Sequence, residues 1–252
     1  AGKFTGTHGD IGTSSFYPAH HITMGEGGAV YTNNMQLKLL IESFRDWGRD
    51  CACPPGMDGI CNNRFVRQFG ELPFGYDHKY VYSHFGYNLK ATEMQASIGL
   101  AQLKKLPGFV KARKKNWAYL RKALAPFSNK LTLPEPTPDS DPSWFAFLMT
   151  VKENAGFTRE QLMAYLEKHK VHTRRLFAGN LIKQPCFDEM RKSGKGFRVV
   201  SDRNPPPSLP VTDWVMLNTF FVGVYPGMNR EKLDYTVAVF KAFFDTVVVK
   251  RS

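Results

Sequence analysis

The sequence has 252 residues, 42% of them hydrophobic, which is enough apolar material for a sizeable core and one or two domains. It contains no run of eighteen apolar residues, so it predicts no membrane-spanning helix. Thirty-four basic and twenty-two acidic residues give a formal net charge of +12. This charge permits an anionic substrate, an acidic protein partner or an acidic membrane surface. Nucleic acid is a weak alternative, because the basic residues are scattered and no zinc-finger or RNP motif accompanies them.

The opening AGKFTGTHGD lacks an initiator methionine and is not a charged-then-apolar leader. Such an opening is typical of the middle of a protein, so we expect the natural start to lie upstream. The absence of a leader and of an apolar span predicts a cytoplasmic location.

The first conspicuous segment, residues 14–28, reads SSFYPAHHITMGEGG. A strand-like piece over residues 15–17 stops at a proline, two histidines follow, and a glycine turn precedes a second expected strand over residues 29–32. A hydroxyl, two imidazoles and a glycine turn are the parts of a phosphate-binding or acid–base site. The alternative is an ordinary strand–turn–strand whose histidines satisfy local hydrogen bonds.

Apolar residues at helical spacing predict a helix over residues 36–47, and a long loop with functional character follows over residues 48–86. Three cysteines of this loop form the pattern C-x-C-x7-C: Cys51, Cys53 and Cys61. Without a secretory signal, clustered thiols favour metal or redox chemistry over disulfides. The spacing matches neither a paired zinc ribbon nor a ferredoxin run, so one ligand is unaccounted for. We expect the distant Cys186 to be a buried small hydrophobe.

Thr92 predicts the cap of a long helix whose apolar face continues to about Phe127. A proline-rich stretch over residues 134–138 then separates two expected domains, 1–127 and 128–252. The elements expected in the second domain are strands over residues 144–152, 171–177 and 217–225, helices that begin at Thr158 and Asn229, and a long loop over residues 193–213.

Residues 14–28 resemble the lysine loop of the sugar aminotransferase-like family of pyridoxal-phosphate enzymes, roughly S-F-H-P-x-K-x-I-T-T-G-E-G-G. Nine positions agree: Ser15, Phe16, Pro18, Ile22, Thr23, Gly25, Glu26, Gly27 and Gly28. Three differ, with Tyr17 at a histidine, Met24 at a threonine and His20 at the Schiff-base lysine. An imidazole cannot form an internal aldimine, but it can move protons near neutral pH. In this family, histidine at that position is the mark of the 3-dehydratases, which use pyridoxamine phosphate.

The resemblance implies a fold-type I, aspartate aminotransferase-like α/β protein. This chain would hold the end of its large domain and the whole small C-terminal α+β domain. His20 would be the catalytic base, and Ser15 would bind the cofactor phosphate. Asn88, in the motif GYN-x-x-x-T-E-x-Q, would reach that phosphate from the second subunit of a homodimer. Tyr17 would orient the cofactor or assist proton transfer, unless it is simply a packed aromatic residue.

The cysteine pattern is similar to that of the iron–sulfur members of this family, so Cys51, Cys53 and Cys61 would be three ligands of a [2Fe-2S] cluster. The fourth ligand and the aspartate that pairs with the pyridine nitrogen would both lie before Ala1. A fragment without them should hold no intact cluster, bind cofactor weakly and be inactive.

The implied reaction is removal of the hydroxyl group at carbon 3 of CDP-4-keto-6-deoxy-D-glucose, in the synthesis of 3,6-dideoxyhexoses and lipopolysaccharide O-antigen. A separate NADH-dependent flavin or iron–sulfur reductase would supply the electrons. Because a nucleotide diphosphate requires cations, Arg174 and Arg203 are candidate substrate contacts, with solvated surface as the alternative. Phe145 could face the active site, although core packing is the simpler interpretation.

Three other functions remain open at this point. A cluster-free 3-dehydratase that uses pyridoxamine phosphate would leave the three clustered cysteines incidental. A sugar aminotransferase of the same family conflicts with His20, because transamination in this fold relies on the lysine. A zinc-stabilised basic binding module would leave the pattern of residues 14–28 unexplained.

Overall fold

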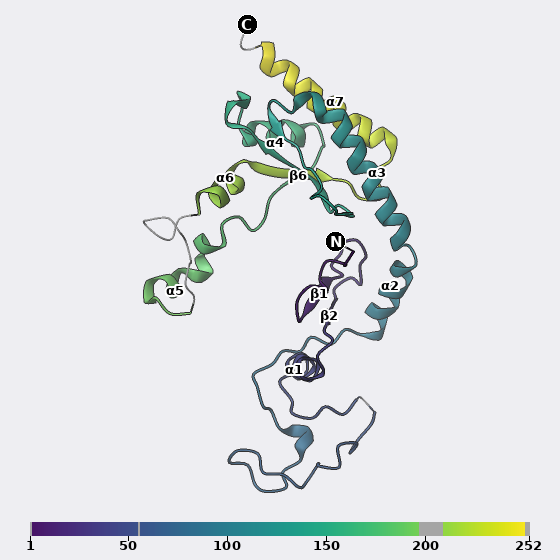
Figure 1. The fold of residues 1–252 in the computed structure, drawn as a ribbon, viewed down its shortest axis with the longest axis vertical. Coiled ribbons are helices and arrows are strands. Elements are labelled where there is room, and N and C mark those ends of the chain that lie inside the picture. The colour runs from purple at the N-terminus through teal and green to yellow at the C-terminus, as the bar shows by residue number, and fades with distance from the viewer. Residues whose placement is uncertain (1, 55, 197–208, 250–252) are drawn as a thin grey trace. The chain divides into compact units, whose positions relative to one another are not determined.

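The computed structural model describes residues 2–54, 56–196 and 209–249 (Figure 1). The chain divides into two compact units, Ala1–Leu106 and Pro107–Ser252. The division falls at the start of helix α3 (Leu106–Leu124), because the apolar face of α3 belongs to the core of the second unit. The domain boundary expected after residue 127 stays a prediction. No helix within the described ranges is long and apolar enough to cross a bilayer.

The first unit begins with a β-hairpin. Strands β1 (Gly12–Ser15) and β2 (Gly28–Tyr31) are antiparallel, and their register pairs Ser15 with Gly28. The first strand therefore ends at Ser15, and the expected continuation to residue 17 was wrong. Phe16 instead begins the connecting turn, where its N–H donates to Gly27 O (2.9 Å) and its carbonyl accepts from Met24 N (2.9 Å).

The described residues of the first unit also form two helices and one short 3-10 turn: α1 (Met35–Arg45), η1 (His78–Tyr80) and α2 (Glu93–Leu103). The predicted cap at Thr92 is confirmed, because Thr92 and Gln95 form a reciprocal capping box. The expected continuous helix is interrupted after Leu103, and α3 starts anew at Leu106 with Pro107 in its first turn, where a missing N–H costs nothing.

The long loop between α1 and α2 is closed at its base by two glycines. Gly48 has a φ of +82°, and a side chain there would place its Cβ 1.9 Å from His84 O. A Cβ on Gly86 would lie 2.2 Å from Gly48 N. The N–H of Ser83 donates to Gly48 O (2.8 Å) across this crossing. The two ends of the loop can therefore approach this closely only because both positions lack a side chain.

The second unit is built on a four-stranded antiparallel sheet in the order β3-β4-β6-β5. Its strands are β3 (Leu131–Thr132), β4 (Ala146–Val151), β5 (Thr173–Arg175) and β6 (Thr219–Gly223). Its remaining helices are η2 (Ala125–Phe127), η3 (Glu153–Ala155), α4 (Arg159–Lys168), η4 (Leu181–Lys183), η5 (Pro185–Phe187), α5 (Asp188–Ser193), α6 (Pro210–Asn218) and α7 (Arg230–Val249).

One face of this sheet carries the core. Alternate residues of β4 are buried, as expected for a strand with one covered face. Helices α3 and α7 lie side by side (Figure 1), and Phe127, just beyond α3, stacks on Phe244 of α7 with ring centroids 4.2 Å apart. The largest fully buried side chains here are Phe147, Phe220, Phe240, Phe244, Leu120, Leu124, Leu131, Met149, Leu162 and Leu166.

The expected strands of the second unit exist but are shorter than their predicted ranges. Residues 210–218 form helix α6, whereas the sequence had placed a loop up to residue 213 and a strand from residue 217. Pro210 sits in the first turn of α6, where its fixed φ suits a helix start, and this signal was overlooked. Cys186 is exposed in the turn η5, so the expectation of a buried Cys186 was wrong.

Two buried polar residues of α3 hold the neighbouring ends of β4 and β6. The guanidinium of Arg113 donates from Nη1 to the carbonyls of Trp144 (3.3 Å) and Phe145 (2.9 Å), just before β4. Asn116 Nδ2 donates to the carbonyls of Val224 (3.3 Å) and Tyr225 (3.1 Å), just after β6. One turn of α3 therefore sets the positions of two strand ends that are far apart in the sequence.

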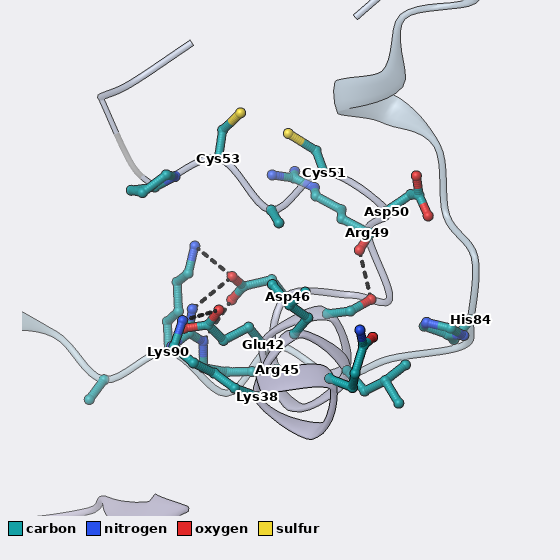
Figure 2. A pocket seen from close by; sticks show the side chains of 17 residues that line it. Lys38, Glu42, Arg45, Asp46, Arg49, Asp50, Cys51, Cys53, His84 and Lys90 are labelled. Atoms are coloured by element: carbon teal, nitrogen blue, oxygen red, sulfur yellow. Dashed lines mark hydrogen bonds and ion pairs between the residues drawn. The ribbon is translucent and has the colours of Figure 1, made fainter. Parts of the chain in front are cut away.

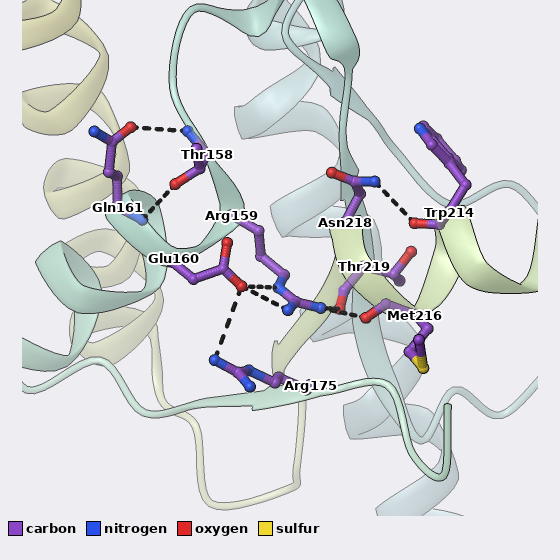
Figure 3. A network of polar contacts seen from close by, with 9 residues as sticks. All are labelled: Thr158, Arg159, Glu160, Gln161, Arg175, Trp214, Met216, Asn218 and Thr219. Carbon is purple, nitrogen blue, oxygen red and sulfur yellow. Dashed lines mark hydrogen bonds and ion pairs between the residues drawn. The ribbon is translucent and has the colours of Figure 1, made fainter. Parts of the chain in front are cut away.

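Arg159 forms a second buried polar joint, between α4, α6 and β6 (Figure 3). Its side chain is only 4% exposed, and Nη1 donates to Met216 O (2.5 Å) and to Thr219 O (3.3 Å). Its Nε donates to Glu160 Oε1 (3.0 Å). The same carboxylate oxygen lies 3.8 Å from Nη2 of Arg175, whose side chain is 64% exposed. Arg159 therefore carries hydrogen bonds to buried carbonyls, whereas Arg175 contributes only a surface ion pair.

We predict that Arg159→Met destabilises the second unit, because two carbonyls and Glu160 lose this donor. The expected loss is about 1–3 kcal/mol in the free energy of unfolding. The matched control Arg175→Met removes the exposed partner of the same carboxylate and should change the free energy by less than about 1 kcal/mol. Urea unfolding followed by tryptophan fluorescence measures both, and equal losses would contradict the structural assignment.

Candidate functional site

Ser15, the exposed last residue of β1, lies close to Tyr17 and His20, which stand on the exposed turn between β1 and β2. The backbone N–H of Tyr17 donates to Ser15 Oγ (3.3 Å), and that of His20 donates to Tyr17 O (2.9 Å). The rings of Tyr17 and His20 meet edge to face, with centroids 6.4 Å apart. A hydroxyl, a phenol and an imidazole are therefore presented side by side, as acid–base chemistry on a phosphorylated ligand requires.

The turn is anchored to α2. Gln95 Nε2 donates to Glu26 O (3.0 Å), while its other amide atom, Oε1, accepts from Thr92 N (2.8 Å) in the capping box. Met24 is buried, and a Cβ added to Gly99 would lie 2.8 Å from Met24 Cγ. The methionine at a position where the family pattern has threonine therefore packs against α2, and its apolar character suits that contact.

Asn88 lies at the other end of the loop, beside the C-terminus of α1. Asn88 pairs with Asp46 in an isolated antiparallel bridge, and next to this bridge Leu89 N donates to Arg45 O (3.0 Å). The backbone of Asn88 is thus fixed, and its side chain is exposed. This arrangement leaves the amide accessible to a ligand or a second subunit.

A cavity of about 710 Å³ lies between α1 and the start of the cysteine loop (Figure 2). Five of its charged side chains pair with one another: Lys38 with Glu42 (3.0 Å), and Asp46 with Arg45 (3.0 Å) and Lys90 (3.2 Å). Arg49 also lines the cavity, and its guanidinium lies over the Trp47 ring, 4.8 Å from the centroid. Burial would raise the pKa of Asp46, but hydrogen bonds from Arg45 and Lys90 outweigh it and hold that pKa below its usual value.

Cys51, Cys53 and Cys61 line one small cavity, together with His78. Figure 2 shows the sulfur atoms of Cys51 and Cys53 directed away from α1. Desolvation opposes ionisation of Cys53, but hydrogen bonds from the Cys51 thiol and from the Cys61 and Ile60 backbone outweigh it, so the pKa of Cys53 is lowered. Burial and the neighbouring thiols raise the pKa of Cys51. Cys53 is therefore the first of this pair to become a thiolate.

The buried His78 connects the cysteines to a hydrogen-bond chain that the sequence analysis missed. Its Nδ1 lies 3.8 Å from Cys61 Sγ, its Nε2 lies 2.5 Å from Asp50 Oδ2, and Ser83 Oγ donates to Asp50 Oδ1 (2.7 Å). The imidazole is stacked on Phe69, with centroids 5.2 Å apart. A histidine within the cysteine loop was the available signal, but its distance of seventeen residues from Cys61 hid the contact.

The three thiols are the soft donors that iron and zinc prefer, so the donor chemistry of this cavity fits an iron–sulfur or zinc site. Among residues 2–54, 56–196 and 209–249, however, no group of three or more His, Cys, Asp or Glu side chains is arranged to hold a metal ion. The expected cluster ligands are therefore brought to one cavity, and metal coordination by them stays a prediction.

The other predicted site residues belong to the second unit. Phe145 precedes β4, and its ring meets Phe221 edge to face at 6.0 Å. Arg174 pairs in register with Phe221 across β5 and β6, so the structure gathers both predicted residues around one aromatic ring that the sequence did not single out. Arg203 lies outside the described residues.

Comparison with known proteins finds relatives over most of the chain. Residues 1–241 match the family model described as the DegT/DnrJ/EryC1/StrS aminotransferase family. The lipopolysaccharide biosynthesis protein RfbH of Salmonella typhimurium is 55% identical over 96% of this chain and 53% of its own length. The dTDP-4-dehydro-2,6-dideoxy-D-glucose 3-dehydratase of Saccharopolyspora spinosa is 49% identical over 94% of this chain and 48% of its own length. The chain thus spans about half the length of the curated relatives it matches.

Solved structures show the same fold. The Escherichia coli GDP-4-keto-6-deoxy-D-mannose-3-dehydratase with bound hydrated PLP has a TM-score of 0.72 at 24% identity, over 94% of this chain and 56% of that one. An aminotransferase from Psychrobacter cryohalolentis has a TM-score of 0.75 at 23% identity, over 96% of this chain and 58% of that one. The aminotransferase-like α/β fold expected from the sequence is confirmed.

We predict that iodoacetamide alkylates Cys53 faster than Cys51 in metal-free, reduced protein, by roughly threefold or more, because the thiolate is the nucleophile. Cys51→Ala removes the hydrogen-bond donor and should slow Cys53, whereas Cys51→Ser keeps a donor and should preserve its rate. Peptide mass spectrometry follows each site, with the exposed Cys186 as an internal reference. Equal rates at Cys51 and Cys53 would contradict the assigned ionisation order.

Proposed function

Because this chain belongs to the DegT/DnrJ/EryC1/StrS aminotransferase family, we propose that it serves a pyridoxamine-phosphate-dependent 3-dehydration of a nucleotide-linked 4-keto sugar. The proposal rests on the position of His20: it replaces the lysine of the family pattern, and it lies beside Tyr17 and close to Ser15. A relative that is 49% identical is named as a sugar 3-dehydratase. A sugar aminotransferase is disfavoured by the same histidine.

In the proposed reaction, His20, Ser15 and Tyr17 would each have a separate role. Pyridoxamine phosphate, when bound, supplies an amine that condenses with the keto group at carbon 4 and a ring that accepts electrons. His20 would take the proton from the aminomethyl carbon, and Ser15 Oγ would donate a hydrogen bond to the phosphate. Tyr17 would orient the imidazole through their edge-to-face contact. Loss of the hydroxyl from carbon 3, with a proton, gives water and an unsaturated sugar.

The finer assignment is the iron–sulfur branch of this chemistry, a CDP-4-keto-6-deoxy-D-glucose 3-dehydrase. Cys51, Cys53 and Cys61 would hold a [2Fe-2S] cluster, which supplies electrons one at a time when a separate NADH-dependent reductase recharges it. The convergence of three thiols on one cavity supports this assignment. Its product would enter dideoxyhexose and lipopolysaccharide synthesis, and the relative named as a lipopolysaccharide biosynthesis protein agrees with that role.

A homodimer belongs to the same proposal. The exposed amide of Asn88 could then reach the cofactor phosphate of the second subunit. Helix α2 has no buried residue, and its apolar side chains Met94, Ile98, Leu100 and Leu103 are all exposed. Since a helix that is apolar on all sides is normally covered by other protein, a second copy is a suitable partner for α2.

A cluster-free 3-dehydratase is the second candidate. It is favoured by the lack of a side-chain group arranged for metal in the described ranges. A relative that is 34% identical over 72% of this chain is named GDP-4-keto-6-deoxy-D-mannose 3-dehydratase, so 3-dehydration recurs among relatives with different nucleotides in their names. Iron and sulfide counts on anaerobically purified protein separate the two candidates.

We predict that His20→Asn in the natural-length protein abolishes dehydration, because the amide cannot take the proton. Incorporation of solvent ¹⁸O at carbon 3 measures reversible water loss without needing a reductase, and it should fall by about 10² or more. The neighbouring His21→Asn should stay within a fewfold of the unaltered protein. Unchanged ¹⁸O exchange in His20→Asn would remove His20 from its role, and iron content should be equal in both variants.

We predict that Cys53→Ala separates the two halves of the reaction. Net formation of the 3-deoxy sugar should stop, because the electron carrier is lost, while ¹⁸O exchange at carbon 3 stays measurable. Iron analysis should show a matching loss of bound iron. The exposed Cys186→Ala is the control and should retain both activities. Unaltered net reduction by Cys53→Ala would rule out the cluster assignment in favour of the cluster-free enzyme.

A further inference from the structure

The 3-10 turn η1 and the residue before it hold the cysteine loop on both sides of Cys61. On one side, the guanidinium of Arg64 donates twice to the carboxylate of Asp77, from Nε (3.0 Å) and from Nη2 (2.9 Å). On the other side, Lys79 Nζ donates to Asp58 Oδ1 (2.9 Å). Two points of the loop are therefore fixed, each three residues away from the cysteine.

His78, the residue between these two contacts, reaches the thiol itself. Its Nδ1 lies 3.8 Å from Cys61 Sγ, and its backbone N–H donates to Arg64 O (3.0 Å). The residue is only 6% exposed, and its ring is stacked on Phe69. Because Nε2 donates to the carboxylate of Asp50, the neutral imidazole presents the lone pair of Nδ1 to the thiol.

Asp50 connects this contact to the other two cysteines. It directly precedes Cys51 in the sequence, and its backbone N–H donates to Val81 O (3.0 Å). Its Oδ1 accepts from Ser83 Oγ (2.7 Å), and its Oδ2 lies 2.5 Å from the imidazole Nε2. A continuous series of contacts therefore runs from the segment of Cys51, through the carboxylate and the imidazole, to Cys61.

The chain between the cysteines has no regular structure that could maintain this arrangement. Seven residues separate Cys53 from Cys61, and the described ones form no helix or strand. An unconstrained chain of this kind loses conformational entropy when its two ends are brought to one ligand. A thiol that is already held beside its partners avoids most of that loss when a metal binds.

We propose that the η1 bracket, which comprises Asp77, His78 and Lys79 together with Asp50, positions Cys61 beside the other two thiols before any metal is present. Within it, His78 and Asp50 are the positioning residues, and neither is a proposed cluster ligand. The three thiols and His78 already line one small cavity. The bracket itself depends on the contacts described here, whereas its service to a [2Fe-2S] cluster rests on the proposed function.

The first test uses metal-free, reduced protein of natural length. Dibromobimane joins two thiols only when they lie close together, and peptide mass spectrometry identifies the joined pair. His78→Phe should lower the yield of cross-links to Cys61 severalfold, because phenylalanine can still stack on Phe69 but loses both polar contacts. The matched control His84→Phe replaces the other histidine of the loop, which stacks on Phe44, and should leave the yield unchanged.

The second test titrates Co(II), whose thiolate charge-transfer absorption reports how many thiolates are bound. His78→Phe should weaken Co(II) binding by about 10–100-fold, the usual effect of losing a residue that orients a ligand. Asp50→Ala should act in the same direction, whereas Asp50→Asn keeps an acceptor for Nε2 and should retain most of the affinity. Lys79→Met removes an exposed ion pair and should cost no more than about fivefold.

A double-mutant cycle distinguishes positioning of Cys61 from general support of the loop. In a Cys61→Ala background no thiol is left to position, so adding His78→Phe should change Co(II) affinity far less than it does in the unaltered protein. Equal losses in the two backgrounds would mean that His78 supports the loop without positioning the cysteine, and would overturn the proposal.

The bracket and the proposed function fail in different ways. Cross-linking that depends on His78, in a protein whose thiols bind neither Co(II) nor iron, would support the bracket and end the cluster assignment. Unchanged cross-linking and Co(II) affinity in His78→Phe, in a protein that holds iron and is active, would overturn the bracket alone. Circular dichroism checks folding, and the partly exposed Asp50 carries both measurements, as Asp50→Ala, if His78→Phe is not folded.

Discussion

The close crossing of the chain at Gly48 and Gly86 is the constraint on which the first unit depends. A side chain at either position would overlap the opposite backbone, so the 39 residues from Gly48 to Gly86 can return to their start only with glycine at both. This crossing fixes three groups at once: the C-terminus of α1, the backbone of Asn88, and Asp50 with its link to His78. The cysteines are therefore displayed from a rigid base, although the loop itself has almost no regular structure.

Burial differs sharply between the two units. The second unit has a contiguous apolar core built from α3, α7 and the sheet, and its buried polar groups Arg113, Asn116 and Arg159 join distant segments through carbonyls. In the first unit, the buried apolar residues among those described are Ile22, Met24 and Val81. Its order comes instead from backbone hydrogen bonds and from bifunctional side chains such as Gln95, which caps α2 and holds the turn at Glu26. The predicted site residues of the turn and of the cysteine loop thus lie in the unit with the smaller core.

Local sequence signals predicted much of this arrangement. The caps at Thr92 and Thr158, the helices that follow them, and the grouping of Ser15, Tyr17 and His20 all depend on neighbours within a few residues. The features that were missed depend on long-range contacts: His78 with Cys61, Phe221 with Arg174, and Arg113 with the start of β4. Helix α6 was missed for another reason, since its proline start was read as loop chemistry. A single sequence shows what a residue can do, but distant pairing depends on tertiary packing.

The apolar surface of helix α2 has a consequence for how copies of the chain behave in solution. Its exposed methionine, isoleucine and leucines favour contact between chains, whereas the net charge of +12 makes the chains repel one another. The two effects respond differently to ionic strength. Repulsion between exposed charges is screened within about 10 Å at 0.1 M salt, while apolar attraction is not weakened by screening. In the proposed homodimer, salt concentration would therefore set the balance between separate and associated chains, with dilute buffer favouring separate chains.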